Sequence, residues 1–68
     1  MHLAYRVNEH ISKRRPATIC DSCIAMAIEI RPQQANRMTI ALETTSDFER
    51  GNGICVDCRK EQKVIRRV

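Results

Sequence analysis

Cys20-Asp21-Ser22-Cys23 is matched near the other end of the chain by Cys55-Val56-Asp57-Cys58, and these two segments decide the fold. Each C-x-x-C places two sulfur atoms on one short turn, close enough to share a metal ion. The two turns together supply the four thiolates of a closed, tetrahedral structural zinc site. A metal held this way ties residue 20 to residue 58. The tie matters because a chain of 68 residues buries only about 60% of its unfolded surface.

Other uses of the four cysteines fit less well. Disulfides belong to oxidising compartments, and the first residues, Met1 to Arg6, carry no apolar signal region or cleavage site. A single C-x-x-C can be a redox pair, but two of them in a chain too short for a βαβ redox fold favour a metal. Tetrathiolate iron stays open, because ligand spacing does not separate zinc from iron.

The composition predicts one small domain over residues 1–68. Hydrophobic residues make up 43% of the chain and Tyr5 and Phe48 are its aromatics, so we expect a small aliphatic core. The formal charge is +4, and four thiolates with one Zn²⁺ would lower it to +2. The net basicity is therefore weak evidence, and the clustering of the basic residues carries more information. The clusters are Lys13-Arg14-Arg15, Arg31, Arg37, Arg59-Lys60, Lys63 and Arg66-Arg67.

No stretch of the sequence approaches the roughly 18 apolar residues of a membrane span, and no lipidation or targeting signal is visible. We therefore expect a soluble, cytoplasmic protein, associated with the nucleoid if it binds DNA.

The first half of the chain predicts two helices. Leu3, Val7 and Ile11 recur at helical spacing and indicate a helix over residues 2–14, which Arg15-Pro16 ends. Thr18 is a candidate cap for a second helix with Cys20 and Cys23 in its first turn, where the helix dipole favours thiolates. The apolar stripe of that second helix consists of Ile19, Cys23, Ile24, Ala27 and Ile28.

The second half predicts a third helix and a β-hairpin. Pro32 suits the first position of a helix over residues 32–44. Its inner face is marked by Ala35, Met38, Thr39 and Leu42, which leaves a polar face of Gln33, Gln34, Asn36 and Arg37. Residues 48–67 then alternate around Gly51-Asn52-Gly53, which predicts two antiparallel strands with the second cysteine pair near their tip.

Three helices followed by a hairpin is the order of a winged helix-turn-helix. The residues Ile24-Ala25-x-x-Ile28-x-Ile30, Ala35-x-Arg37, Leu42-Glu43 and Phe48-Glu49-Arg50 resemble the pattern of this family in many small bacterial regulators. The resemblance covers about residues 19–67. It implies an α+β fold, mostly helical, with helix 32–44 in the major groove and the 48–67 hairpin as the wing. It further implies a zinc-stabilised transcriptional regulator whose partner is double-stranded DNA.

The same resemblance assigns roles to the polar and basic residues. Gln33, Gln34, Asn36 and Arg37 match the exposed positions of the recognition helix, and their side chains suit adenine and guanine edges. Two further groups would contact phosphates: Arg59, Lys60 and Lys63 in the wing, and Lys13, Arg14 and Arg15 before the second helix. His2 and His10 are expected to be exposed helix residues, because four cysteines complete the metal shell.

Three positions depart from the family pattern. Glu29 stands where the turn usually carries glycine, so either the turn is wider or Glu29 adopts a positive φ. Thr39 replaces a large aliphatic residue. Ile40 occupies a position that is usually polar, which predicts that it lies in a self-association surface or beneath the first helix. A homodimer is therefore one of the states that the sequence leaves open.

Two other classes of function fit the sequence less well. An enzyme is not expected, because a tetrathiolate zinc has no open position and no nucleophile or carboxylate pair stands out. The alternative to DNA binding is a zinc-finger adaptor that binds a protein partner such as RNA polymerase. A gel shift with mixed duplex at low salt separates the two, because an adaptor retains no duplex.

Overall fold

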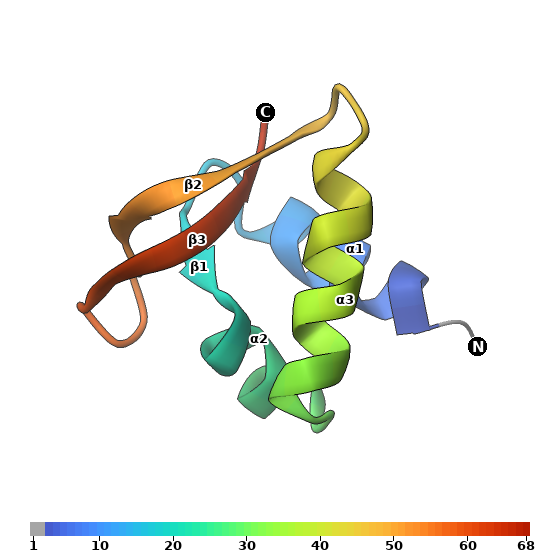
Figure 1. Ribbon diagram of the computed structural model, residues 1–68, viewed down its shortest axis with the longest axis horizontal. Coiled ribbons are helices and arrows are strands. Elements are labelled where there is room, and N and C mark those ends of the chain that lie inside the picture. Colours follow the sequence, from blue (N-terminus) through green and yellow to red (C-terminus); the bar gives the residue numbers. More distant parts are fainter. Residues whose placement is uncertain (1–2) are drawn as a thin grey trace.

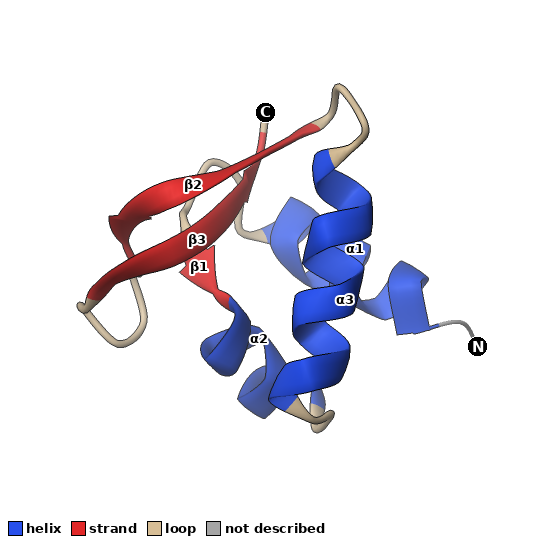
Figure 2. Cartoon of the chain, viewed as in Figure 1, coloured by secondary structure: helices blue, strands red, loops and turns tan. Residues whose placement is uncertain are grey.

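A computed structural model describes residues 3–68 of the chain (Figure 1). Within these residues the fold is α+β, with three helices and a three-stranded antiparallel sheet (Figure 2). The elements in chain order are α1 (Leu3–Lys13), β1 (Ile19–Cys20), α2 (Asp21–Ile28), α3 (Pro32–Glu43), β2 (Phe48–Ile54) and β3 (Glu61–Arg67).

The predicted hairpin is confirmed, and a third strand joins it. β2 and β3 pair from Phe48 opposite Arg67 to Ile54 opposite Glu61. β1 pairs with the other edge of β3, with Ile19 opposite Ile65, so the strand order is β1-β3-β2. This short strand ties the hairpin to the helical body, because α2 begins at the residue after β1.

The core is small and aliphatic, as the composition predicts. α1 contributes Val7 and Ile11, α2 contributes Ile24, and the sheet contributes Ile19 and Ile65, all of them fully buried. Figure 1 shows α3 in front of α1, with the hairpin extending to the side of both. The aliphatic core therefore lies where the three helices meet one face of the sheet.

The first and third helices follow the sequence prediction closely. α1 ends at Lys13, within one residue of the predicted end, and the chain then turns through a cis Arg15–Pro16 bond. Residue 2, the predicted start of this helix, lies outside the described residues. α3 begins at Pro32 as predicted and ends at Glu43, one residue early. His10, predicted to be exposed, is half-buried.

The prediction for the second helix was partly wrong. Thr18 does not cap it: α2 begins at Asp21, and Cys20 is its N-cap residue with extended backbone angles. The Thr18 hydroxyl instead donates to the carbonyl of Ile54 at 2.6 Å. Residues 19 and 20 are extended because they pair with β3, a long-range contact that outweighs the local signal for a helix start. Ala27, assigned to the apolar stripe, is exposed.

The turn between α2 and α3 contains three residues. Of the two alternatives expected for it, a wider turn or a positive φ at Glu29, the structure has the second. Glu29 adopts φ 59° and ψ 51°, in the left-handed region. The N–H of Ile30 donates to the carbonyl of Ala25 at 2.9 Å, which satisfies an acceptor at the helix end. Arg6 reaches across from α1 and donates to the carbonyl of Ile28 at 2.6 Å. A cation at this helix C-terminus is favourable, because the last carbonyls carry partial negative charge.

Candidate metal centre

The two C-x-x-C segments come together as the sequence predicts. The four Sγ atoms of Cys20, Cys23, Cys55 and Cys58 all lie within 4.8 Å of one another. The Sγ atoms of Cys20 and Cys58 are 3.8 Å apart. A tetrahedral site with Zn–S bonds of about 2.3 Å has sulfur–sulfur edges of about 3.8 Å. The donor set and its spacing therefore fit one tetrathiolate metal ion.

Within each pair the two cysteines differ in burial. Cys20 ends β1 and Cys55 follows β2, and both are buried in the core. Cys23, in the first turn of α2, and Cys58, in the turn after Cys55, are partly exposed. The metal site therefore lies at the edge of the core, with one sulfur of each pair facing inward.

Polar groups around the sulfur atoms favour negative charge at the site. The backbone N–H of Cys20 donates to Sγ of Cys55 at 3.4 Å, and the Gln62 amide donates to Sγ of Cys58 at 3.3 Å. Burial would raise the pKa of Cys55, but backbone N–H groups of Cys58, Cys20 and Asp57 outweigh it and lower the pKa to about 6. Burial raises the pKa of Cys20 and Cys23. Such donors also orient metal-bound thiolates.

The second cysteine turn is held by backbone hydrogen bonds. Cys55 donates to the carbonyl of Lys60 at 3.1 Å, and Arg59 donates to the carbonyl of Cys55 at 2.8 Å. Arg59 has φ 64°, a left-handed angle that closes this turn. The N–H of Val56 donates to the carbonyl of Thr18 at 2.9 Å, so the turn is also fastened to the residue before β1.

Asp57, between the second pair of cysteines, connects this turn to the residue that follows α1. Its carboxylate accepts two hydrogen bonds from the Arg14 guanidinium, at 2.5 and 2.6 Å. The hydrogen bonds and charge of Arg14 hold the pKa of Asp57 below its usual value. Arg14 was predicted to contact phosphate, and in this structure its guanidinium is engaged within the protein.

Asp21, between the first pair of cysteines, connects the metal site to α3 and β2. Its Oδ1 accepts from the Thr39 hydroxyl at 2.8 Å, and its Oδ2 accepts from the Asn36 amide at 2.8 Å. Oδ2 also accepts from Arg50 at 3.4 Å. Neither aspartate was assigned a role from the sequence. The available signal was that each C-x-x-C contains an acidic residue, but the sequence does not reveal their partners.

The outer face of α3 carries fewer free polar groups than predicted. Gln33 and Arg37 are exposed, and no side-chain hydrogen bond to either occurs within residues 3–68. The side chain of Gln34 accepts from the backbone N–H of Arg31 at 3.0 Å and so caps the helix. Asn36 does not face outward: it is half-buried and bound to Asp21, because α2 packs beside it.

Ile40, also on α3, is 48% exposed. It is therefore not buried beneath the first helix, and its place in a self-association surface stays a prediction.

The structure distributes the basic candidates over three places. Lys13 and Arg15 lie at and just after the end of α1, where Lys13 pairs with Glu9 at 3.6 Å. Arg59 and Lys60 lie in the turn that carries the second cysteine pair, and Lys63 lies on β3. All five side chains are exposed, so their predicted contacts with phosphate remain compatible with the fold.

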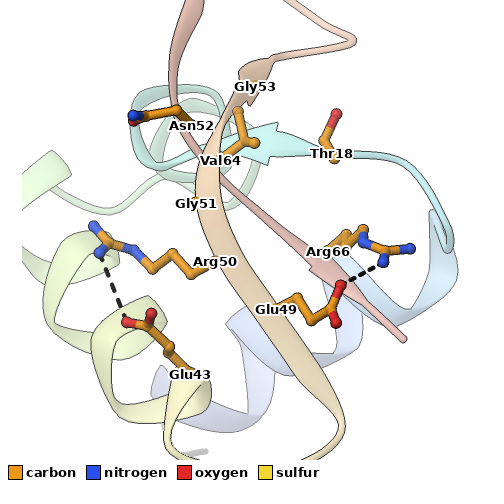
Figure 3. A pocket seen from close by; sticks show the side chains of 9 residues that line it. All are labelled: Thr18, Glu43, Glu49, Arg50, Gly51, Asn52, Gly53, Val64 and Arg66. Carbon is orange, nitrogen blue, oxygen red and sulfur yellow. Dashed lines mark hydrogen bonds and ion pairs between the residues drawn. The ribbon is translucent and has the colours of Figure 1, made fainter.

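A shallow groove of about 500 Å³ lies along β2, with Glu43 of α3 on one side of the strand and Thr18 and Arg66 on the other (Figure 3). Arg50 extends from one face of β2 toward Glu43 of α3, with 3.9 Å between Nη1 and Oε1. Glu49 and Arg66 pair on the opposite face of the hairpin. The hairpin therefore has a face turned toward α3 and a face turned away from it, because successive strand residues point to opposite sides.

Comparison with protein-family models, with curated proteins and with solved structures finds no match to this chain. None of the helices between residues 3 and 68 has the length and apolar character needed to cross a bilayer.

Proposed function

We propose that this chain is a non-catalytic, zinc-stapled winged helix-turn-helix domain that binds double-stranded DNA. In this proposal α3 enters the major groove and the β2–β3 hairpin is the wing. Support comes from α2 and α3, which are joined by a three-residue turn, and from the hairpin, which follows α3 and pairs with β1. A helix pair with a turn of three or four residues is typical of the helix-turn-helix.

The observation that carries the proposal is the exposed side of α3. Gln33 and Arg37 are one helical turn apart, both are exposed, and neither is engaged within residues 3–68. Glutamine suits the N6 and N7 atoms of adenine, and arginine suits the O6 and N7 atoms of guanine. These two residues are therefore the base-reading candidates, ahead of Gln34 and Asn36, whose side chains already have partners.

The metal would be structural. Zn²⁺ bound by four thiolates supplies folding free energy and leaves no coordination position open for substrate. The four cysteines would hold the start of α2 against the hairpin turn, which keeps the proposed wing beside the helical body.

The first test uses Arg37. A preferred site is selected from a randomised duplex library, and affinities are measured by fluorescence anisotropy on that site and on random duplex. Arg37→Ala should cost about 1–3 kcal/mol on the preferred site and little on random duplex, because a lost base contact matters only where that base is present. An equal loss on both duplexes would mean that Arg37 does not read a base.

The second test uses two basic residues on opposite faces of β3. Lys63 lies opposite Asn52, on the same face as Arg50, which turns toward α3. Arg66 lies on the other face, paired with Glu49. Lys63→Ala should weaken binding to every duplex and reduce the salt slope of log K by about one, as expected for one phosphate contact. Arg66→Ala is the matched control and should leave the slope unchanged. The wing assignment fails if the two variants behave alike.

One observation favours the adaptor alternative. Met26 is 79% exposed and, with Ala27, lines a groove of about 580 Å³ beside Cys23 and Cys58. Exposed methionines are common at protein-binding surfaces. The adaptor function takes precedence if the zinc-loaded chain retains no duplex at micromolar concentration and low salt, where non-specific DNA binding is strongest.

A further inference from the structure

Asp21 joins the metal site to α3. It is the first residue of α2, directly after the ligand Cys20 and two residues before Cys23. Its side chain is 18% exposed, and both carboxylate oxygens accept hydrogen bonds from α3 at 2.8 Å. One donor is the hydroxyl of Thr39, a fully buried residue. α3 is therefore bonded to a side chain that belongs to a metal-binding turn.

The same carboxylate also contacts the hairpin. Arg50 of β2 donates to Oδ2 of Asp21 at 3.4 Å, and its other terminal nitrogen lies 3.9 Å from Glu43 at the end of α3. The Arg50 side chain is 10% exposed. Charged groups this deeply buried are costly to leave without partners. Asp21, Arg50 and Glu43 therefore link the metal turn, the hairpin, and the middle and C-terminal end of α3 by polar contacts.

Asp57 provides the internal comparison. It also lies between two cysteine ligands, but its carboxylate is 31% exposed and binds Arg14, just after α1. None of the hydrogen bonds or ion pairs of Asp57 within residues 3–68 reaches α3 or Arg50. The two aspartates are thus alike in chemistry and in distance from the cysteines, but they connect the metal site to different parts of the molecule.

We propose that Asp21 is a positioning residue that couples metal binding to the placement of α3 and the hairpin. This inference rests on the proposed function for its effect on DNA affinity. Two of the four sulfur ligands, Cys20 and Cys23, would fix the backbone on both sides of Asp21, and the fixed carboxylate then holds Thr39, Asn36 and Arg50. Without that restraint the turn can move and α3 loses its buried acceptor. DNA affinity then depends on the metal through Asp21, although Asp21 itself contacts no base.

The test compares Asp21→Asn with Asp57→Asn in the full chain loaded with Co²⁺. The charge-transfer and d–d absorption of Co²⁺ reports the four-sulfur site directly. An asparagine at position 21 cannot accept from all three donors, because its NH₂ group is itself a donor. We expect both variants to bind one Co²⁺ with the wild-type spectrum. In Asp21→Asn alone, amide protection over residues 32–43 should fall about tenfold, as expected for loss of hydrogen bonds to a buried charge.

Two further variants make the result decisive. Asp21→Asn combined with Asn36→Asp reverses donor and acceptor and should recover most of the protection. Thr39→Val changes the α3 side alone, leaves the metal turn intact, and should lower protection in the same direction but less. If Asp21→Asn does not fold, Thr39→Val alone tests the positioning role. Unchanged protection in both Asp21→Asn and Thr39→Val, or a fall of equal size in Asp57→Asn, would overturn the positioning role.

The DNA measurement is separate from the exchange measurement. If wild type binds duplex, Asp21→Asn should bind about tenfold more weakly while Asp57→Asn stays within about twofold. Equal affinity of wild type and Asp21→Asn would overturn the coupling. If wild type binds no duplex while Asp21→Asn still loses protection, the proposed function fails and the positioning role stands.

Discussion

The two C-x-x-C segments have the same spacing but very different surroundings. Cys20 to Cys23 lie at a strand–helix junction inside the fold, where Asp21 is bonded to α3 and β2. Cys55 to Cys58 lie at the tip of the hairpin, where Val56 is exposed and Arg59 has a strained, left-handed backbone. The first segment is held by the core and by bonds to α3 and β2, whereas the second has only Cys55 in the core and is otherwise held by hydrogen bonds to Thr18 and Arg14. Equal ligand spacing therefore does not imply equal dependence on the metal.

The largest expected effect comes from removing one ligand from each segment. Both Cys20→Ser and Cys55→Ser should abolish metal binding. The resulting loss of folding stability should be severe, because structural zinc contributes about 10–16 kcal/mol against a typical domain stability of about 5–15 kcal/mol. In Cys55→Ser, amide protection of residues 48–67 should disappear while α1 retains more. Loss of the metal releases Asp21 in both variants, so protection of α3 should fall in both. It should fall further, and over α2 as well, in Cys20→Ser, because Cys20 is itself the N-cap residue of α2.

Native mass spectrometry and hydrogen exchange measure both variants, and the mass of the wild-type ion also separates zinc from iron. A folded, metal-free wild-type chain with two disulfides would contradict the metal site itself. Identical exchange patterns in the two serine variants would contradict the difference between the segments.

The sequence predicted the four-cysteine cluster, the three helices and the hairpin, because each has a local signature. It failed where distant residues decide the structure. Ile19 and Cys20 became a strand because β3 pairs with them, although Thr18 looks locally like a helix cap. Asn36 looked like an exposed base reader, and its partner Asp21 lies on another helix. The assignments to DNA remain predictions for the same reason: they concern a surface whose partner is not part of the chain.

A moderate effect is expected at the two left-handed residues, one at the end of the helix that follows the first segment and one directly after the second. Glu29 has φ 59° and Arg59 has φ 64°, angles that cost an ordinary residue about 1–2 kcal/mol and glycine little. Glycine relieves this strain, but it also makes the unfolded chain more flexible, which offsets part of the gain. Glu29→Gly and Arg59→Gly should therefore each stabilise the metal-loaded protein by about 0.5–1 kcal/mol. Urea denaturation measures the gain. The alanine variants are the controls, because they remove the same side chains without relieving the backbone and should give no gain.

A smaller effect separates the two glycines of β2. A Cβ at Gly51 would meet nothing within 4 Å, whereas one at Gly53 would lie 3.1 Å from Cγ2 of Val64. Neither glycine has a positive φ. Gly51→Ala should therefore stabilise the chain by about 0.4–1 kcal/mol, by reducing the entropy of the unfolded state. Gly53→Ala should gain less or lose stability, because Val64 is buried opposite Cys20 of the first cysteine segment and must shift. The same denaturation curves decide the order, and a larger gain for Gly53→Ala would contradict the packing.

The smallest effect concerns His10 on α1, beside the contact that fastens the second segment. Burial lowers the pKa of His10 below its usual 6.5, Arg14 and Lys13 lower it further, and Asp57 opposes them. The neutral imidazole therefore favours the folded state. Its contribution to stability is complete above pH 6.5 and is lost as the pH falls through 6.5 toward the lower folded pKa. An NMR titration of the His10 ring in the metal-loaded chain should give a midpoint below 6.5. In Asp57→Asn the midpoint should fall further, because the opposing carboxylate is gone and Arg14 keeps its charge. A midpoint at or above 6.5 in the wild-type chain would show that the carboxylate of Asp57, rather than burial and Arg14, controls this histidine.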